Sequence, residues 1–286
     1  MASPDGVGVD PATPMTFETL EYERRGAIGV VMLNRPQVLN AINGQLLDDL
    51  DEVLDQIEKD DDIRVVVLHG AGRSFCAGFD LKDEAKAESA NVVDLAPALQ
   101  RDFDAIMRLW NFPKPTISAV HGYAIAGGCE LALACDLTVA DETFKLGEPD
   151  LRFGAGVVVM LLPWLTGPKQ AKELYFTGDD RVPADRCLQM GLINKVVPEG
   201  EHLDAAMAMA RKIAVIDPFS MTTTKKSINR TYDIMGMREA LGDSHDMGVL
   251  IEAAVVPERE EFMAIARKDG LKAAIAWRDA RFADSD

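Results

Sequence analysis

The chain has 286 residues, of which 48% are hydrophobic, and this is enough to bury a full core, so disorder of the whole chain is excluded. The 47 acidic and 30 basic residues give a net charge of −17, which argues against binding to nucleic acids through general electrostatic attraction. No apolar run reaches the roughly 18 residues of a membrane span, and the chain begins without the basic and apolar segments of a secretory signal. With four cysteines and no Cys-x-x-Cys pair, we expect reduced thiols in a cytoplasmic protein that contacts no membrane.

The first part of the chain predicts a leader, a hairpin, a helix and a buried strand, in that order. Residues 1–15 are rich in Gly, Pro and Asp without periodicity, which is typical of a disordered leader. Residues 17–33 alternate apolar and polar side chains around a glycine, and this pattern predicts a β-hairpin. Apolar residues then recur at helical spacing over 46–57, and the apolar run over 64–68 predicts a buried strand.

The alternation of helices and strands continues to about residue 198. It predicts a helix over 93–110, a strand over 116–120, a short helix from Gly128 and a strand over 137–140. Such alternation indicates an α/β core with parallel strand pairing. Beyond residue 198 the pattern is almost entirely helical. Periodicity alone does not distinguish an open doubly wound sheet from a spiral of ββα turns.

Two glycine-containing loops indicate a site for a negatively charged oxygen. In HGYAIAGGCELALACD (121–136), Gly127 and Gly128 precede the carboxylate Glu130, which opens an apolar run. Glycines at such a junction allow a ligand to approach the unpaired N–H groups at a helix start, where the helix dipole favours an oxyanion. A second loop, FCAGFDLKD (75–83), follows another strand-like run. The two loops could each direct one N–H group at the same carbonyl oxygen.

These loops belong to four segments that resemble the enoyl-CoA hydratase/isomerase family, also called the crotonase family. The segments follow the family's order and are LNRPQVLNAI (33–42), SFCAGFDLK (74–82), PKPTISAVHGYAIAGGCELALACD (113–136) and FKLGEPDLRFG (144–154). The resemblance implies a crotonase-like α/β spiral of ββα turns over residues 16–200. It also implies a C-terminal helical region over 201–286 that builds trimers or dimers of trimers and covers the active site.

The resemblance further implies an acyl-CoA thioester as substrate, held by two backbone donors. At the matching positions these are the N–H groups of Ala77 and Gly127. The residues expected to contact the substrate are Ala77, Gly78, Phe79, Asp80, Lys82 and Gly127. No separate cofactor is implied, because CoA is part of the substrate, and the four histidines show no spacing typical of a metal site.

Two carboxylates match the family's proton-transfer positions, Glu130 and Asp150. Glu130 borders a buried helix rather than a polar face; the alternative is a helix-start carboxylate stabilised by the dipole. At Asp150 the family's hydratases usually have Glu, and a turn or N-cap aspartate is the alternative. Glu148 is the reserve candidate for the second carboxylate.

The segment after Gly154 departs from the family pattern, since it lacks the usual glycine-rich turn and is shorter up to Gly167. This changes the lining of the acyl pocket and leaves the acyl chain open. We therefore expect hydration of a 2-enoyl-CoA first and double-bond isomerisation second, because isomerisation can proceed with one carboxylate. Thioester hydrolysis or carbon–carbon lyase chemistry comes third. A non-catalytic acyl-CoA binder or an RNA binder is disfavoured by Glu130 and by the acidic composition.

Overall fold

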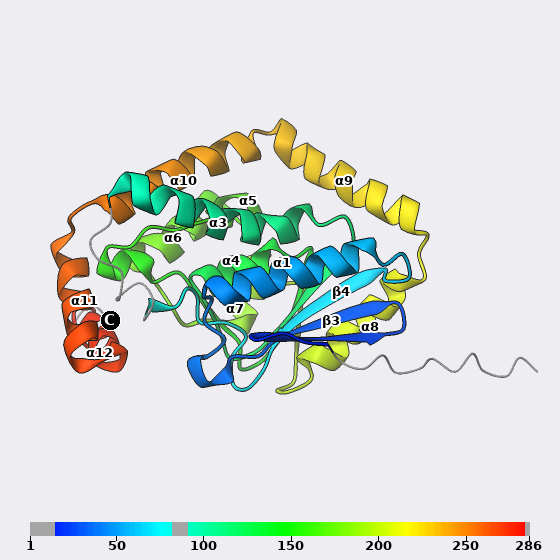
Figure 1. Cartoon of the computed structure of the whole chain (residues 1–286), viewed down its shortest axis with the longest axis horizontal. Coiled ribbons are helices and arrows are strands. Elements are labelled where there is room, and N and C mark those ends of the chain that lie inside the picture. The colour runs from blue at the N-terminus through cyan, green and yellow to red at the C-terminus, as the bar shows by residue number, and fades with distance from the viewer. Residues whose placement is uncertain (1–14, 82–90, 284–286) are drawn as a thin grey trace, which may run out of the picture.

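The computed structural model describes residues 15–81 and 91–283, with two β-sheets flanked by helices (Figure 1). The larger sheet has the order β1-β2-β3-β4-β5-β7-β10, with bounds Met15–Thr16, Leu20–Arg25, Ile28–Leu33, Val65–Gly70, Thr116–Val120, Leu137–Asp141 and Lys195–Val197. The smaller sheet has the order β6-β8-β9, with bounds Tyr123–Ile125, Lys145–Gly147 and Val182–Pro183.

The helices of the described residues lie around these sheets. Those before β9 are η1 (Pro36–Val38), α1 (Gly44–Lys59), α3 (Val92–Asn111), α4 (Gly127–Ala134), η2 (Asp150–Phe153), α5 (Leu162–Leu165) and α6 (Pro168–Thr177). The later ones are α7 (Ala184–Gln189), α8 (His202–Ala214), α9 (Pro218–Ile234), α10 (Met237–Ala253), α11 (Pro257–Asp269) and α12 (Leu271–Ala280).

The larger sheet begins as an antiparallel hairpin and continues in parallel. β2 pairs with β3 across a turn at Gly26, whose φ of 65° suits glycine. β3, β4, β5, β7 and β10 then pair in parallel. Helix α8 packs against β3, β4, β5 and β7, while α1, α3 and α4 lie on the other side of the sheet (Figure 1). The predicted hairpin and parallel α/β core are confirmed, and burial on both faces explains the continuous apolar run at the start of β4.

Helix α1 illustrates how a local pattern determines an element. The side chain of Asn43 accepts the N–H of Leu46 at 3.0 Å and caps the helix. The apolar face is buried through Leu46, Leu47, Leu50, Val53, Leu54 and Ile57. Burial of each such side chain contributes about 1.5–3 kcal/mol. The predicted helix over 46–57 is confirmed, and the cap extends it by two residues at its start.

The C-terminal helices follow the prediction of helical structure after residue 198. Helices α9 and α10 form an arch, in which α10 packs on α3 (Figure 1). Helices α11 and α12 pack on each other, and α11 contacts η2, the short helix that begins at Asp150. The ring of Phe262 on α11 stacks on Phe153 of η2 with 4.6 Å between centroids. This contact brings α11 to the segment that follows the second predicted carboxylate.

Some expectations concern residues that the structure does not describe. These are Lys82 and, apart from Met15, the leader over 1–15. Within 15–81 and 91–283, no helix is long and apolar enough to cross a membrane. The thiols of Cys76, Cys129, Cys135 and Cys187 are all buried and free, as expected for reduced cysteines.

Candidate active site

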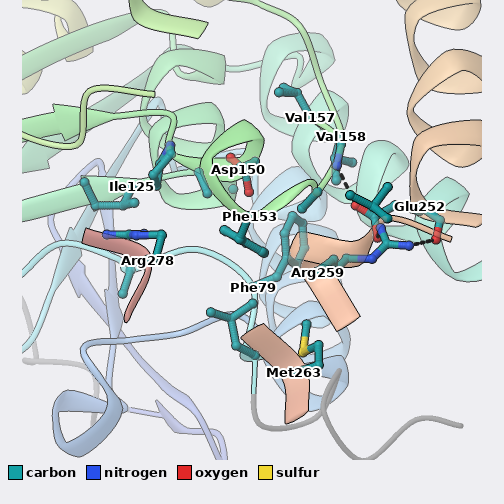
Figure 2. A pocket seen from close by; sticks show the side chains of 18 of the residues that line it. Phe79, Ile125, Asp150, Phe153, Val157, Val158, Glu252, Arg259, Met263 and Arg278 are labelled. Carbon is teal, nitrogen blue, oxygen red and sulfur yellow. Dashed lines mark hydrogen bonds and ion pairs between the residues drawn. The ribbon is translucent and has the colours of Figure 1, made fainter. Parts of the chain in front are cut away.

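A cavity of about 750 Å³ lies where the β6–α4 junction, η2, α3 and the C-terminal helices meet. Figure 2 shows side chains around it, among them Asp150 and Phe153 of η2 and Phe79 of the loop that follows β4. Glu130 and Gly127 of α4 also line the cavity. The two glycine loops and both predicted carboxylates therefore meet at one cavity.

Glu130 is buried on α4 and faces this cavity. Its Oε1 accepts the N–H of Val159 at 2.7 Å, and its Oε2 has no hydrogen-bond partner among the described residues. Burial raises the pKa of Glu130 well above its usual range, the Val159 N–H opposes this, and the charge of Asp150 adds to it. A carboxyl with one anchored and one unpaired oxygen can exchange a proton with a ligand in the cavity.

Asp150 begins η2 and lines the same cavity. Its Oδ2 is buried with no partner in the described part of the chain. Burial raises the pKa of Asp150 to about 7, with Glu252 adding to the increase and Arg278 opposing it. Asp150 is thus a group that can take up and release a proton near neutral pH.

Glu148 is buried too, but it does not line the cavity. Burial raises its pKa well above the usual range, and the charges of Glu130 and Asp150 raise it further. Its position makes the reserve candidate less suited to direct contact with a substrate than Asp150.

The backbone donors differ from the expectation at one position. The N–H of Ala77 donates to the carbonyl of Leu39 at 3.0 Å, so it is not free to hold a substrate oxygen. Phe79 forms a parallel bridge with Ile42, in which the N–H groups of Ile42 and Asp80 make the hydrogen bonds. The N–H of Phe79 points away from this bridge and has no acceptor within the described ranges. The hydrogen bond to Leu39 therefore contradicts Ala77 as the donor and leaves Phe79 as the candidate donor of this loop.

Gly127, the other residue predicted as a donor, lies at the start of α4. Gly127 is the first residue of the helix, so its N–H has no partner within the helix. A Cβ at Gly127 would lie 2.5 Å from the ring of Phe79, and one at Gly78 would lie 2.7 Å from the carbonyl of Ile125. The two loops therefore approach each other closely because both carry glycine. Ala126, with a φ of 51°, makes the sharp turn from β6 into the helix.

The other predicted substrate contacts divide into two groups. Ala77, Phe79 and Gly127 line the cavity, whereas Gly78 and Asp80 do not. Asp80 instead forms an ion pair with Arg35 at 3.1 Å, which ties the loop to the segment before α1. Lys82 lies outside the described residues.

Several charged residues that line the cavity were missed by the sequence reasoning, among them Glu252, Arg259 and Asp102. Glu252 ends α10 and accepts the N–H of Gly156 at 2.6 Å, and Arg259 of α11 pairs with it at 2.7 Å. Asp102 of α3 continues the face of Leu95, Ala98 and Leu99 along the wall. Burial raises the pKa of Asp102 to about 7. The only sequence signal was the spacing of 95, 98, 99 and 102, which places them on one helix face.

The described residues contain no group of three or more His, Cys, Asp or Glu side chains arranged to hold a metal ion. The polar groups of the cavity are carboxyls, arginines, the tyrosine Tyr123 and backbone N–H groups. This set suits proton transfer next to a carbonyl oxygen that gains negative charge.

Comparisons with known proteins agree with this geometry. A family model described as enoyl-CoA hydratase/isomerase matches residues 23–257. The short-chain-enoyl-CoA hydratase of Clostridium acetobutylicum is 35% identical over 222 residues, which cover 76% of this chain and 83% of that protein. A probable enoyl-CoA hydratase of Rhizobium meliloti is 32% identical over 274 residues, which cover 94% of this chain and 99% of that protein.

A solved structure is similar over nearly the whole chain. It is the crystal structure of an enoyl-CoA hydratase/isomerase from Xanthobacter autotrophicus Py2, at 46% sequence identity and a TM-score of 0.91. The match covers 93% of this chain and 99% of that one. The prediction of a crotonase-like α/β fold with C-terminal helices is therefore confirmed.

Proposed function

Because the chain belongs to the enoyl-CoA hydratase/isomerase family, we propose that it adds water to a 2-enoyl-CoA and forms a 3-hydroxyacyl-CoA. The observation that carries this proposal is that Glu130 and Asp150 line one cavity beside two unpaired backbone donors. Two carboxyls at one water are what hydration requires, since one proton leaves the water and another reaches Cα.

In this proposal the thioester oxygen accepts from the N–H groups of Phe79 and Gly127. Addition at Cβ moves negative charge onto this oxygen, and two donors fixed by the fold stabilise that charge. Loss of one such donor typically lowers turnover by roughly 10²–10³-fold. The positive end of the α4 dipole adds to the stabilisation at Gly127.

Glu130 and Asp150 share the proton transfers. One carboxylate takes a proton from the water whose oxygen bonds to Cβ, and the other, protonated, donates a proton to Cα as the double bond is lost. Exchange with solvent then restores the starting protonation. Burial favours this arrangement, because it raises the pKa of both carboxyls and allows one to remain protonated near neutral pH.

Double-bond isomerisation is the second candidate, and the shorter side chain of Asp150 favours it. Isomerisation moves one proton from one carbon of the acyl chain to another, which Glu130 alone can carry. Thioester hydrolysis or carbon–carbon cleavage would use the same oxygen site and comes third.

We also propose self-association as trimers or dimers of trimers, through the arch of α9 and α10. Its exposed apolar side chains include Phe219, Ile228, Ile234, Met235, Met247 and Leu250. Exposed apolar side chains on neighbouring helices are typical of an oligomer interface. Sedimentation at several protein concentrations tests this, and a strictly monomeric species would contradict it.

The proposed reaction is tested with a panel of acyl-CoA thioesters and mass spectrometry. A gain of one water by 2-enoyl-CoA substrates is the expected result. A shift of the double bond without change in mass favours the isomerase, and release of free CoA favours the hydrolase. Turnover of none of the panel would contradict an acyl-CoA enzyme.

A further inference from the structure

Glu252 links the C-terminal helices to the segment that holds Glu130. At the end of α10, its Oε1 accepts the N–H of Gly156 at 2.6 Å, and its Oε2 accepts from Arg259 at 2.7 Å. The side chains of Glu252 and Arg259 are only 22% and 15% exposed, respectively. Figure 2 shows this ion pair at the cavity wall, next to Val157 and Val158. Both oxygens of the carboxylate are thus used, one on the loop and one on α11.

The loop that Glu252 holds ends at Val159, whose backbone N–H donates to Glu130. From Gly156 the chain passes through two residues that line the cavity to Val159, whose N–H is 2.7 Å from Oε1 of Glu130. At the other end, the N–H of Ala155 donates to the carbonyl of Asp150 at 3.0 Å. A shift of this short loop would therefore move the anchor of Glu130 and disturb Asp150.

Helix α10 touches the loop without side chains between them. A Cβ at Gly156 would lie 3.0 Å from the carbonyl oxygen of Gly248, and a Cβ at Gly248 would lie 3.0 Å from that of Val157. Glu252 follows Gly248 by one helical turn and lies on the same face. The backbone contact with Gly248 therefore limits how closely the loop can approach α10, and the hydrogen bond from Gly156 to Glu252 keeps the loop from moving away.

We propose that Glu252, held in place by Arg259, is a positioning residue that fixes the 155–159 loop so that Val159 orients Glu130 toward the substrate. The inference rests on the proposed role of Glu130. Without the bond to Gly156 the loop can relax, and the carboxyl of Glu130 loses its anchor. A displacement of about 1 Å at a reacting group can lower turnover by up to roughly 10²-fold.

Two substitutions separate hydrogen bonding from packing. Glu252→Met keeps the length of the side chain but removes both acceptors, and we expect kcat to fall about 10- to 100-fold with little change in KM. Glu252→Gln retains an acceptor for Gly156, and we expect it to keep most of kcat. The control is Glu261→Gln, which removes the same charge from an exposed site on α11 that does not line the cavity.

A double-mutant cycle with Glu130→Gln distinguishes positioning from general stabilisation. If Glu252 acts through Glu130, adding Glu252→Met to Glu130→Gln lowers kcat little further. If kcat of the double variant falls by the product of the two single-variant losses, the positioning role is overturned. Thermal unfolding checks that each variant is folded. Should Glu252→Met fail to fold, the same cycle is run with Arg259→Gln, which removes the ion pair that holds Glu252. An unchanged kcat in Arg259→Gln, or a kcat loss that multiplies in full with that of Glu130→Gln, again overturns the inference.

Failure of the proposed function gives a different result. Near-normal turnover in Glu130→Gln alone removes Glu130 from the mechanism, whatever the Glu252 variants do. A normal kcat in Glu252→Met, with Glu130→Gln inactive, overturns the positioning inference and leaves the proposed reaction in place.

Discussion

Two groups of buried or half-buried titratable side chains lie in different parts of this molecule. The carboxyls of Glu130 and Asp150 line the cavity, and each has an oxygen with no partner among the described residues. The histidines His69, His121 and His202 form a second group that does not line it. Burial raises the pKa of the two carboxyls, lowers that of His69 to about 4 and lowers that of His202 from its usual value.

The histidines are largely engaged with one another and with their neighbours. The ring of His121 stacks on that of His202 with 4.4 Å between centroids. His202 Nδ1 lies 3.2 Å from Asp141, and His121 Nε2 lies 2.9 Å from the carbonyl of Gly72. Burial thus shifts a pKa in both groups, at Glu130 and Asp150 in the first and at His69 in the second. Access to a cavity, rather than the shift, is what singles out the carboxyls as a reaction site.

The largest effect is expected from Glu130→Gln, which removes the proton-transfer group and keeps the shape. Turnover should fall by roughly 10²–10⁴-fold, with little loss of acyl-CoA binding. Steady-state kinetics and ligand titration measure both quantities. The matched control is Asp49→Asn, a buried carboxyl outside the cavity that accepts from Thr19 and Gln45, and it should keep kcat per folded molecule close to that of the wild type. A loss of similar size in both variants would contradict the claim that access to the cavity makes a buried carboxyl part of the reaction site.

The next effect concerns the backbone donors at the cavity. Gly127→Ala places a Cβ 2.5 Å from the ring of Phe79 and should displace one donor loop, lowering kcat about tenfold or more. Gly242→Ala in α10 is the control, because a Cβ there meets nothing within 4 Å, and it should be neutral or slightly stabilising. Equal kcat values in the two variants would argue against an oxygen site at Gly127.

The sequence predicted what depends on neighbouring residues and missed what depends on distant ones. Helix α1 followed from its cap and apolar spacing, and Gly127 with Glu130 followed from their place at a helix start. The choice between Ala77 and Phe79 could not be made from the loop, because the carbonyl that occupies the N–H of Ala77 belongs to Leu39. That contact depends on tertiary folding.

The contact of Glu252 with Gly156 was even less accessible to sequence reasoning, since 96 positions separate the two residues. Nothing local distinguishes Glu252 from an exposed helical glutamate. The same limit applies to Arg259, whose role depends on how α11 packs against η2.

A smaller effect is expected at Asp102, the carboxyl on the α3 wall of the cavity. Asp102→Leu should improve kcat/KM for longer alkyl acyl chains by up to about tenfold, because a carboxyl in an apolar wall disfavours alkyl groups. Short chains that do not reach α3 should be unaffected. Kinetics over a series of chain lengths measures this, and a uniform change along the series would place the acyl chain elsewhere.

The smallest effect is expected at His69, on stability rather than rate. Its pKa is lowered to about 4 in the folded chain, against about 6.5 when unfolded, so the folded state favours the neutral ring. Stability is therefore present above pH 6.5 and is lost as the pH falls toward 4. His69→Asn should lessen this decline by a few degrees in Tm and leave kcat unchanged at pH 7. Thermal unfolding at several pH values measures it, and identical profiles would contradict the effect of burial.

The central claim, that Glu130 and Asp150 act on one water beside one thioester, is tested most directly with isotopically labelled water. The wild-type enzyme should convert a 2-enoyl-CoA into a 3-hydroxyacyl-CoA that carries the labelled oxygen at Cβ. Asp150→Asn should suppress this incorporation, whereas exchange at Cα that needs only Glu130 should persist. A wild-type enzyme that moves the double bond but never incorporates labelled oxygen would contradict the account and establish the isomerase.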